Sequence, residues 1–219
     1  MRHLHSSPAC IVETAIWRFA QDGLHLSTAE IAKHASISNG HLFRAFPTKQ
    51  ALLDACYTHT VTQLAAPLHE GAMQAQPGEL LRVQLWRWWM LPAKVALAQR
   101  EVFDFWRLYR TRPRKPGGTE PLLGPFAPVP TLVERALVAA PPALQSVVSL
   151  PRLGSSLAGQ WTAALDTILS DPMCRGQHAL QGQLIGQAYQ AWWQSLGISE
   201  LVPAVPLPPQ RPTPGSGDS

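Results

Sequence analysis

A polar run at residues 38–44 has side chains suited to contacts with nucleic acid. Its members carry short or flexible hydrogen-bonding groups, which can reach base edges in a groove or the phosphates beside it. A glycine within the run would let the backbone come close to the groove. We therefore expect a DNA-reading surface made of Ser38, Asn39, Gly40, His41 and Arg44.

Three short helices are expected to present this run. Apolar residues at helical spacing predict a first helix over about 11–23, and Ser27 forms with Glu30 the capping box of a second. The third covers about 38–46, and a long helix follows over about 48–73. Short helices joined by tight turns, with the third one polar and exposed, fit a helix-turn-helix.

The segment from Thr28 to Leu53 is similar to the N-terminal signature of the TetR family of transcriptional regulators. It reads T-x-x-I-A, and then, from Ala35, A-x-I-S-x-G-x-L-F-x-x-F-x-x-K-x-x-L-L. The resemblance covers about the first quarter of the chain. It implies an all-α fold, in which an N-terminal three-helix helix-turn-helix domain precedes a larger C-terminal helical domain for ligand binding and dimerisation.

Carried over by position, the resemblance also implies DNA contacts outside the polar run. Thr28 and Lys49 each stand at the start of a helix, where they would meet backbone phosphate. Phe43 would lie half in the core and half at the DNA interface. Other interpretations stay open, since Thr28 could only begin its helix, His41 could be an ordinary exposed histidine, and Arg44 could pair with a neighbouring acid.

Three positions depart from the family pattern. Phe43 stands where the family usually has Tyr, and Ala45 where it often has His or another polar residue, so two possible phosphate hydrogen bonds are lost. Pro8 replaces a common Arg. We therefore expect a larger share of the DNA affinity to come from Arg44 and Lys49. The arm before the first helix would add Arg2, His3 and His5.

Aromatic residues gather in the remainder of the chain, which holds every tryptophan except Trp17. Spacing and Pro/Gly content predict helices over about 81–92 and 93–110, a loop over 111–130 and a short helix over 131–140. Aromatic side chains facing inward from different helices could line a cavity for a flat apolar ligand, or could simply form the core. The candidates for ligand contact are Trp86, Trp89, Met90, Phe103 and Trp106.

Residues 107–115 contain five basic side chains and no acidic one. Such a run is typical of a solvated loop, and alternatively of a contact with nucleic acid or an anionic ligand. The five are Arg107, Arg110, Arg112, Arg114 and Lys115.

Two long amphipathic helices are predicted to end the fold, over about 153–168 and 180–196. Their apolar faces are too broad for one small core. We therefore expect them to meet their symmetry mates in a four-helix interface, as the resemblance implies. Gly182 and Gly186 would allow close approach there, or would only loosen the helix. The expected interface residues are Leu157, Trp161, Leu165, Leu184, Ala188 and Trp192.

Composition limits the other possibilities. The chain has 219 residues, a formal net charge of +4 and 15% charged residues, which permits a nucleic-acid partner without requiring one. Three widely spaced cysteines argue against a disulfide framework or a zinc site, and no apolar run is long enough to span a membrane. No hydrolase, metalloprotease, phosphate-loop or paired-carboxylate motif occurs. We therefore expect neither an enzyme nor a metal or cofactor.

The chain is thus expected to have three parts. Residues 1–54 form the DNA-binding domain, 55–200 the ligand-binding and dimerisation domain, and 201–219 a Pro-rich tail without a fixed fold. The predicted function is a cytoplasmic, homodimeric repressor that binds a palindromic operator in double-stranded DNA and is released by a small apolar or aromatic inducer. The alternative is a DNA-binding protein of the same type without an inducer, either constitutive or controlled by a protein partner.

Overall fold

The computed structural model describes residues 7–69, 79–112, 124–138 and 150–197. Nearly all of these residues lie in helices, and no strand occurs within these ranges, so the predicted all-α class is confirmed. None of the described helices is both long and apolar enough to cross a membrane. The N-terminal arm and the Pro-rich tail expected from the sequence lie outside the described residues.

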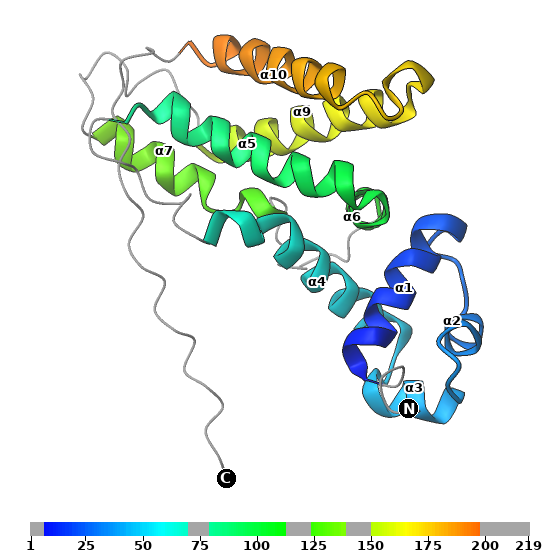
Figure 1. Cartoon of the computed structure of the whole chain (residues 1–219). Helices are drawn as coiled ribbons and strands as arrows, with labels where there is room; N and C mark the ends of the chain where they lie inside the picture. Colours follow the sequence, from blue (N-terminus) through cyan, green and yellow to red (C-terminus); the bar gives the residue numbers. More distant parts are fainter. Residues whose placement is uncertain (1–6, 70–78, 113–123, 139–149, 198–219) are drawn as a thin grey trace.

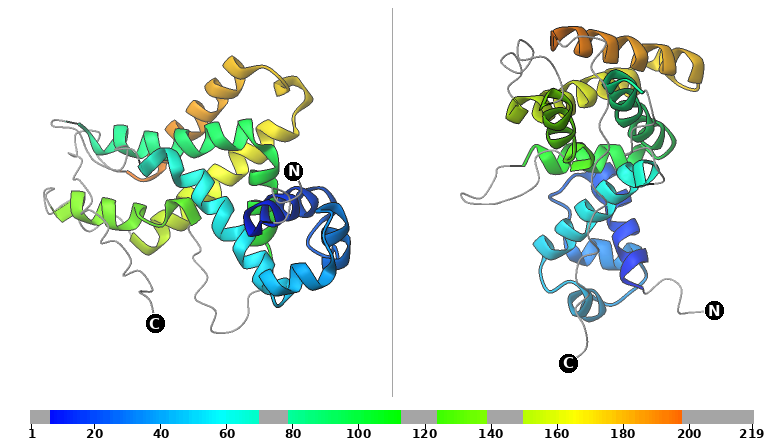
Figure 2. Two further views of the ribbon diagram at one scale, coloured as in Figure 1. Left: turned by 60° about the horizontal axis from the view of Figure 1, so that its bottom comes forward. Right: turned by 90° about the vertical axis from the view of Figure 1, so that its left-hand side faces the viewer.

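The helices form a small and a large body, with one long helix running between them (Figure 1). Three short helices make the small body, and α6 packs against the first of them where the two bodies meet. In the right-hand view of Figure 2 the last helix lies on the side of the large body that is away from the small body. The elements are α1 (Pro8–Asp22), α2 (Thr28–His34), α3 (Asn39–Ala45), α4 (Lys49–His69), α5 (Leu81–Ala98), α6 (Arg100–Arg110), η2 (Gly124–Phe126), α7 (Val129–Val138), α9 (Leu150–Ser170), η3 (Pro172–Cys174) and α10 (His178–Ser195).

Side-chain caps fix the starts of the short helices. The Ser27 hydroxyl accepts a hydrogen bond from the backbone N–H of Glu30, and the Glu30 carboxylate accepts one from the backbone N–H of Ser27, which confirms the predicted capping box. These hydrogen bonds hold the pKa of Glu30 below its usual value. Ser38 caps α3, and the Thr48 hydroxyl accepts from the N–H of Ala51 at the start of α4. The starts of α2, α3 and α4 are therefore fixed by side chains of the local sequence.

The boundary between α5 and α6 differs from the prediction. We expected a helix end near Pro92, but Pro92 lies buried inside α5, which continues to Ala98. A proline inside a helix loses one backbone hydrogen bond and its ring crowds the carbonyl four residues before it. Burial of the Pro92 ring in the core offsets part of that cost. The break falls at Gln99, whose ψ of 76° is not helical. The predicted loop over 111–130 is also too long, because α7 already begins at Val129.

Aromatic side chains pack around Trp161 in the centre of the large body. Its ring meets those of Phe103, Trp106 and Phe126 at steep angles, with centroids 5.2–5.8 Å apart. Its indole N–H donates to the carbonyl of Trp89 at 2.9 Å. Edge-to-face packing of this kind adds to the stabilisation gained by burying the rings. Trp161 therefore joins α5, α6, η2 and α9.

Most of the predicted dimer-interface residues lie inside this same core, which corrects their assignment. Leu157, Trp161, Leu165 and Trp192 are at most 2% exposed in the single chain. They have almost no surface to offer to a second copy, because their helices use these faces to pack on α5 and on each other. Leu184 and Ala188 are only half-buried. An interface on α9 and α10 would therefore use the opposite faces of both helices.

Candidate nucleic-acid interface and its link to the helical core

The predicted DNA-reading residues lie together on α3. Leu42 points into the core of the small body, while Asn39, Gly40 and Phe43 face solvent, Phe43 with 44% of its surface exposed. A Cβ added at Gly40 would have nothing within 4 Å, so the backbone there is open to close approach. The structure thus leaves Asn39, Gly40, Phe43 and Arg44 exposed on α3, with His41 partly exposed, as a helix that reads a major groove requires.

Two residues of this surface have additional local roles. The Ser38 hydroxyl accepts from the backbone N–H of His41 at 3.2 Å, so it caps the helix and is only partly available to DNA. The Arg44 side chain donates from Nε to the carbonyl of Gly40 at 3.4 Å. Among the described residues Arg44 forms no ion pair, so nothing there supports the alternative in which it pairs with an acid.

Lys49 and Thr28 occupy the positions that the family pattern implies. Thr28 is the first residue of α2, and Lys49 is the first residue of α4. The Lys49 ammonium lies 5.9 Å from the centre of the Phe19 ring, a cation–π arrangement. Partial burial lowers the pKa of Lys49, and the negative charge of Glu30 opposes that shift. Lys49 is thus a cation that is not fully hydrated, which reduces the cost of bringing it to a phosphate.

A hydrogen-bonded cluster joins the first turns of α4 to the end of α6. We name it the α4–α6 latch, and it consists of Gln50, Asp54, Tyr109 and Arg112. The Asp54 carboxylate accepts from the Tyr109 hydroxyl at 2.7 Å and from the Gln50 amide at 2.6 Å. Arg112 donates to Gln50 and covers the Tyr109 ring at 3.6 Å. Tyr109 also stacks on Tyr57 of α4 with ring centroids 4.2 Å apart.

The latch explains part of the basic run at 107–115. Arg112 belongs to the latch, while Arg110 covers the Trp106 ring at 4.4 Å and donates to Thr162 of α9. Arg107 lies near Asp104 and Asp166. The solvated-loop interpretation is therefore wrong for these three arginines, which pack against the fold. The other two basic residues of the run lie outside the described residues.

The predicted ligand residues do not converge on one site. Phe103 and Trp106 are neighbours within the core, with ring centroids 6.3 Å apart. Trp89 faces α10 and donates its indole N–H to the carbonyl of Ile185 at 3.2 Å. Trp86 and Met90 are half-buried, and Trp86 lies near the outer surface of α5. The candidates therefore fall into two groups, with Phe103 beside Trp106 in the core, and Trp86 and Trp89 against Tyr189 of α10.

Buried polar groups mark Trp106 again and two core positions, Thr60 and Trp88, that the sequence analysis did not single out. Thr60 Oγ1, Trp88 Nε1 and Trp106 Nε1 are buried without a hydrogen-bond partner in the described part of the chain. They belong to α4, α5 and α6, which pack on one another. The signal for Thr60 was present in the sequence, since it stands four residues after Cys56 and four before Leu64 on the buried face of α4. A polar residue at a core position requires a partner.

A turn places the Trp106 indole. Gly124 begins η2 with a φ of 49°, and a Cβ added there would lie 2.8 Å from Trp106 Nε1 and 3.5 Å from the Tyr57 hydroxyl. Only glycine leaves this space and tolerates this backbone conformation. The Trp106 N–H therefore lies against η2. On α6, Trp106 is one helical turn before Tyr109 of the latch.

Comparisons with known proteins bear on the N-terminal helices and on the fold as a whole. Residues 11–56 match the family model described as "Bacterial regulatory proteins, tetR family". A tetR family transcription regulator from Shewanella sp. PV-4 is 23% identical, with a TM-score of 0.69 over 86% of this chain and 96% of its own. A TetR family transcription regulator from Marinobacter aquaeolei VT8 is 20% identical, with a TM-score of 0.64 over 85% and 95%. The family match thus covers the DNA-reading helices, and the similar structures show that the remaining helices share this fold.

Proposed function

We propose that this chain, whose residues 11–56 match the family model of bacterial regulatory proteins of the tetR family, is a homodimeric repressor that a small apolar or aromatic ligand releases from its operator. The observation that carries the proposal is the α4–α6 latch. It joins α6, which passes through the aromatic core, to the first turns of α4, where Lys49 lies. A shift of α6 therefore reaches the helix that begins at the DNA surface.

The buried polar groups support a ligand site in this core. Two indole N–H groups, of Trp88 and Trp106, and the Thr60 hydroxyl are left without partners among the described residues. A buried donor without an acceptor costs about 1–3 kcal/mol, so a ligand that supplies acceptors gains affinity there. Because indole N–H groups only donate, the ligand is proposed to carry carbonyl, ether or similar oxygen atoms on an apolar frame. Such a ligand would move α6 and so disturb the latch.

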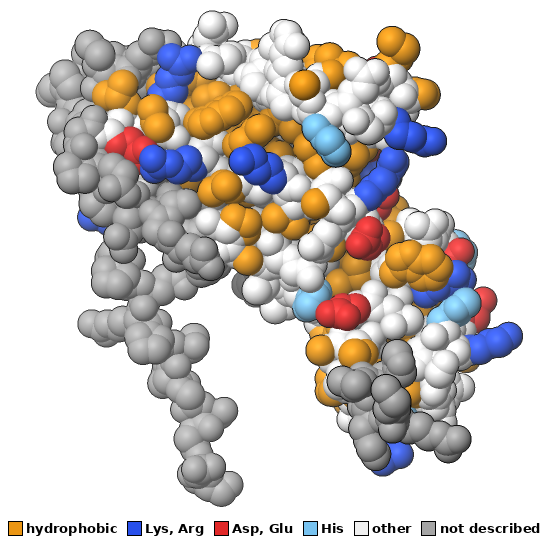
Figure 3. Space-filling view, in the orientation of Figure 1, with side chains coloured by type: hydrophobic (Ala, Val, Ile, Leu, Met, Phe, Trp, Pro, Cys, Tyr) orange, Lys and Arg blue, Asp and Glu red, His pale blue; other side chains and the backbone are white. Residues whose placement is uncertain are grey.

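The outer faces of α9 and α10 support a dimer. The 18 residues of α10 include no Asp, Glu, Lys or Arg, although one side of this helix is exposed. A helix face that stays in water normally carries charges, and cores of protein interfaces are depleted of them. Few charged side chains are visible along α10 at the top of Figure 3. The exposed positions among the described residues of these helices are Ser156, Gly159, Gln160, Ala163, Thr167 and Ser170 on α9, and His178, Ala179, Gln183, Gln187, Gln190, Ala191, Gln194 and Ser195 on α10.

A footprint on the DNA upstream of the protein's own coding region tests the proposal. We expect protection of a palindrome whose half-sites lie about one or more helical turns apart, each turn being about 10–10.5 base pairs. Protection should weaken as salt rises, because phosphate contacts release counterions. If no protected palindrome forms at low or physiological salt, the proposed repressor function is wrong.

Lys49→Ala should weaken operator and nonspecific binding alike. Removing one phosphate contact from each DNA-binding head should lower the slope of log affinity against log salt by about 1 per head. The lowered pKa of Lys49 adds a pH dependence. As the pH of the binding assay rises, the Lys49 ammonium should lose its proton before an ordinary lysine, whose pKa is about 10.4. The affinity of the wild type for DNA should therefore begin to fall at a pH lower than this value. Lys49→Arg should keep its affinity there, and an unchanged salt slope in Lys49→Ala would show that Lys49 does not contact phosphate.

On the proposal that the Tyr109–Asp54 hydrogen bond favours the DNA-binding arrangement of α4, Tyr109→Phe should weaken operator binding by up to about tenfold, because it removes this bond but keeps the ring. A net hydrogen bond contributes about 0.5–1.5 kcal/mol, and 1.4 kcal/mol corresponds to a factor of ten. Fluorescence anisotropy with labelled operator measures the change. Tyr57→Phe is the control, since it leaves the Asp54 hydrogen bonds intact. If Tyr109→Phe and Tyr57→Phe bind the operator equally well, the latch does not affect DNA binding.

A further inference from the structure

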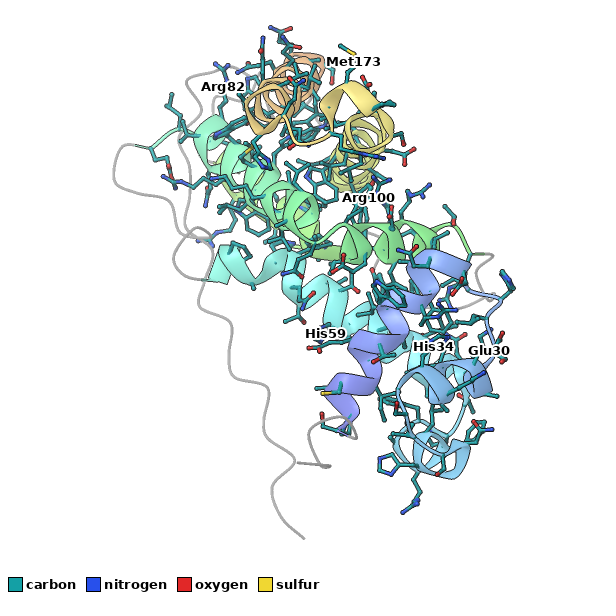
Figure 4. The ribbon with its side chains drawn as sticks, turned by 45° about the vertical axis from the view of Figure 1, so that its right-hand side comes forward. Glu30, His34, His59, Arg82, Arg100 and Met173 are labelled. Atoms are coloured by element: carbon teal, nitrogen blue, oxygen red, sulfur yellow. The ribbon has the colours of Figure 1, made fainter. Side chains whose placement is uncertain are left out.

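A surface groove lies between the start of α5 and the last turns of α10. It has a volume of about 290 Å³. Two hydrogen bonds tie its walls together, since the Tyr189 hydroxyl donates to the carbonyl of Arg82, and the Arg82 guanidinium donates to Gln190. Arg82 is labelled beside α10 in Figure 4. The groove is lined by Leu80, Arg82, Val83, Trp86, Tyr189 and Gln190.

The groove presents apolar surface to solvent. Val83 is 42% exposed, which is unusual for a large aliphatic side chain in this fold. Trp86 is half-buried and meets the Tyr189 ring at 65°, with centroids 5.0 Å apart, so part of its indole remains open. A fixed aromatic ring beside aliphatic side chains is the kind of surface on which proline rings pack in the recognition of polyproline segments.

The sequence after the last described residue carries proline at every third position from 203 to 212. A polyproline II helix has three residues per turn, so in that conformation these four rings would share one side. We name this series the proline ridge, and it consists of Pro203, Pro206, Pro209 and Pro212. Other prolines of the same segment, Pro208 and Pro214, would lie off this side.

The ridge begins within reach of the groove. Gln190 precedes the end of α10 at Ser195 by five residues, which is about 7.5 Å along the helix axis. Gly197 has a φ of 64°, a left-handed conformation that turns the chain away from the axis of α10. The six residues from Gly197 to Pro203 span up to about 20 Å when extended. The chain therefore offers enough length to return to the groove.

We propose that the proline ridge of the chain's own C-terminal segment docks in this groove and packs its rings on Trp86 and Val83. The segment is tethered next to the groove, so its effective concentration there is far higher than that of a free partner. Because proline restricts the backbone of any segment that contains it, less conformational entropy is lost on docking. Docking would cover the open side of Trp86 and hold the end of α10 against α5.

Cysteine trapping in the full-length chain tests the proposal. The background carries Cys10→Ser, since Cys56 and Cys174 are buried. Val83→Cys is combined with Leu207→Cys, and disulfide formation under mild oxidation is followed by nonreducing electrophoresis and mass spectrometry. We expect an intrachain disulfide that forms about tenfold faster than in a control with Lys94→Cys, an exposed position of α5 outside the groove.

Substitutions in the tail identify what docks without perturbing the folded helices. Pro206→Ala with Pro209→Ala, both on the ridge, should reduce the rate to that of the control. Pro208→Ala with Pro214→Ala, off the ridge, should leave it high. Equal rates in the groove and control pairs would overturn the proposal, and so would loss of the fast reaction in both proline variants. A disulfide between two chains would show that a second copy occupies the groove, which also contradicts it.

Discussion

Replacement of Trp161 by alanine is expected to lower the free energy of unfolding by about 3–5 kcal/mol. The Trp161 side chain is 0% exposed, and three aromatic rings pack against it. Its indole N–H also donates to the carbonyl of Trp89. The substitution leaves a cavity at the point where α5, α6, η2 and α9 meet, together with a buried carbonyl that loses this donor. Chemical denaturation followed by circular dichroism measures the change.

Gln160→Ala is the matched control for Trp161→Ala. Gln160 is the preceding residue of α9 and is exposed in the single chain, so its replacement should change the stability of the single chain by no more than about 0.5 kcal/mol. The comparison also separates two roles for Trp161. If Trp161→Ala folds with wild-type stability but dissociates a dimer, Trp161 lies at the interface that the sequence analysis predicted and not in the core.

The error over Trp161 has a physical cause. Apolar residues at helical spacing mark the face of a helix that is removed from water, but they do not say what covers it. Burial against the chain's own helices and burial against a second copy leave the same pattern. For α9 and α10 the apolar face turned out to be internal. The opposite face, with its Gln, Ala and Gly, was the more informative one, because it lacks the charges expected of a surface in water.

Local sequence predicted the small body far better than the large one. The starts of α2 and α4 depend on side chains within three residues, such as Ser27 with Glu30, so they are readable without tertiary structure. The break at Gln99 depends on packing that also keeps Pro92 inside a helix. The latch joins Asp54 to Tyr109, which lie 55 positions apart in the sequence. No local pattern relates two such residues, so only the fold could reveal their contact.

Placement of a carboxylate on the uncharged face of α10 is expected to have the largest effect on DNA binding. Ala191 is exposed in the single chain and lies on the face proposed to meet a second copy. Ala191→Glu would bury two glutamates in a symmetric interface, and an unpaired buried charge costs several kcal/mol. We expect monomers in light scattering. Because each DNA-binding head would then act alone, operator affinity should fall by about a hundredfold or more.

Ala98→Glu distinguishes this effect from a general cost of the substitution. Ala98 is also an exposed helical alanine, but it lies at the end of α5, away from the uncharged face. Neither variant changes the core of the single chain, and only Ala191→Glu should lose the dimer. A lower unfolding temperature of Ala191→Glu than of Ala98→Glu is then the stability lost with the second copy. An Ala191→Glu protein that stays dimeric and protects the operator like the wild type would place the interface elsewhere. In that case the absence of charge on α10 would need a different explanation from pairing of two copies.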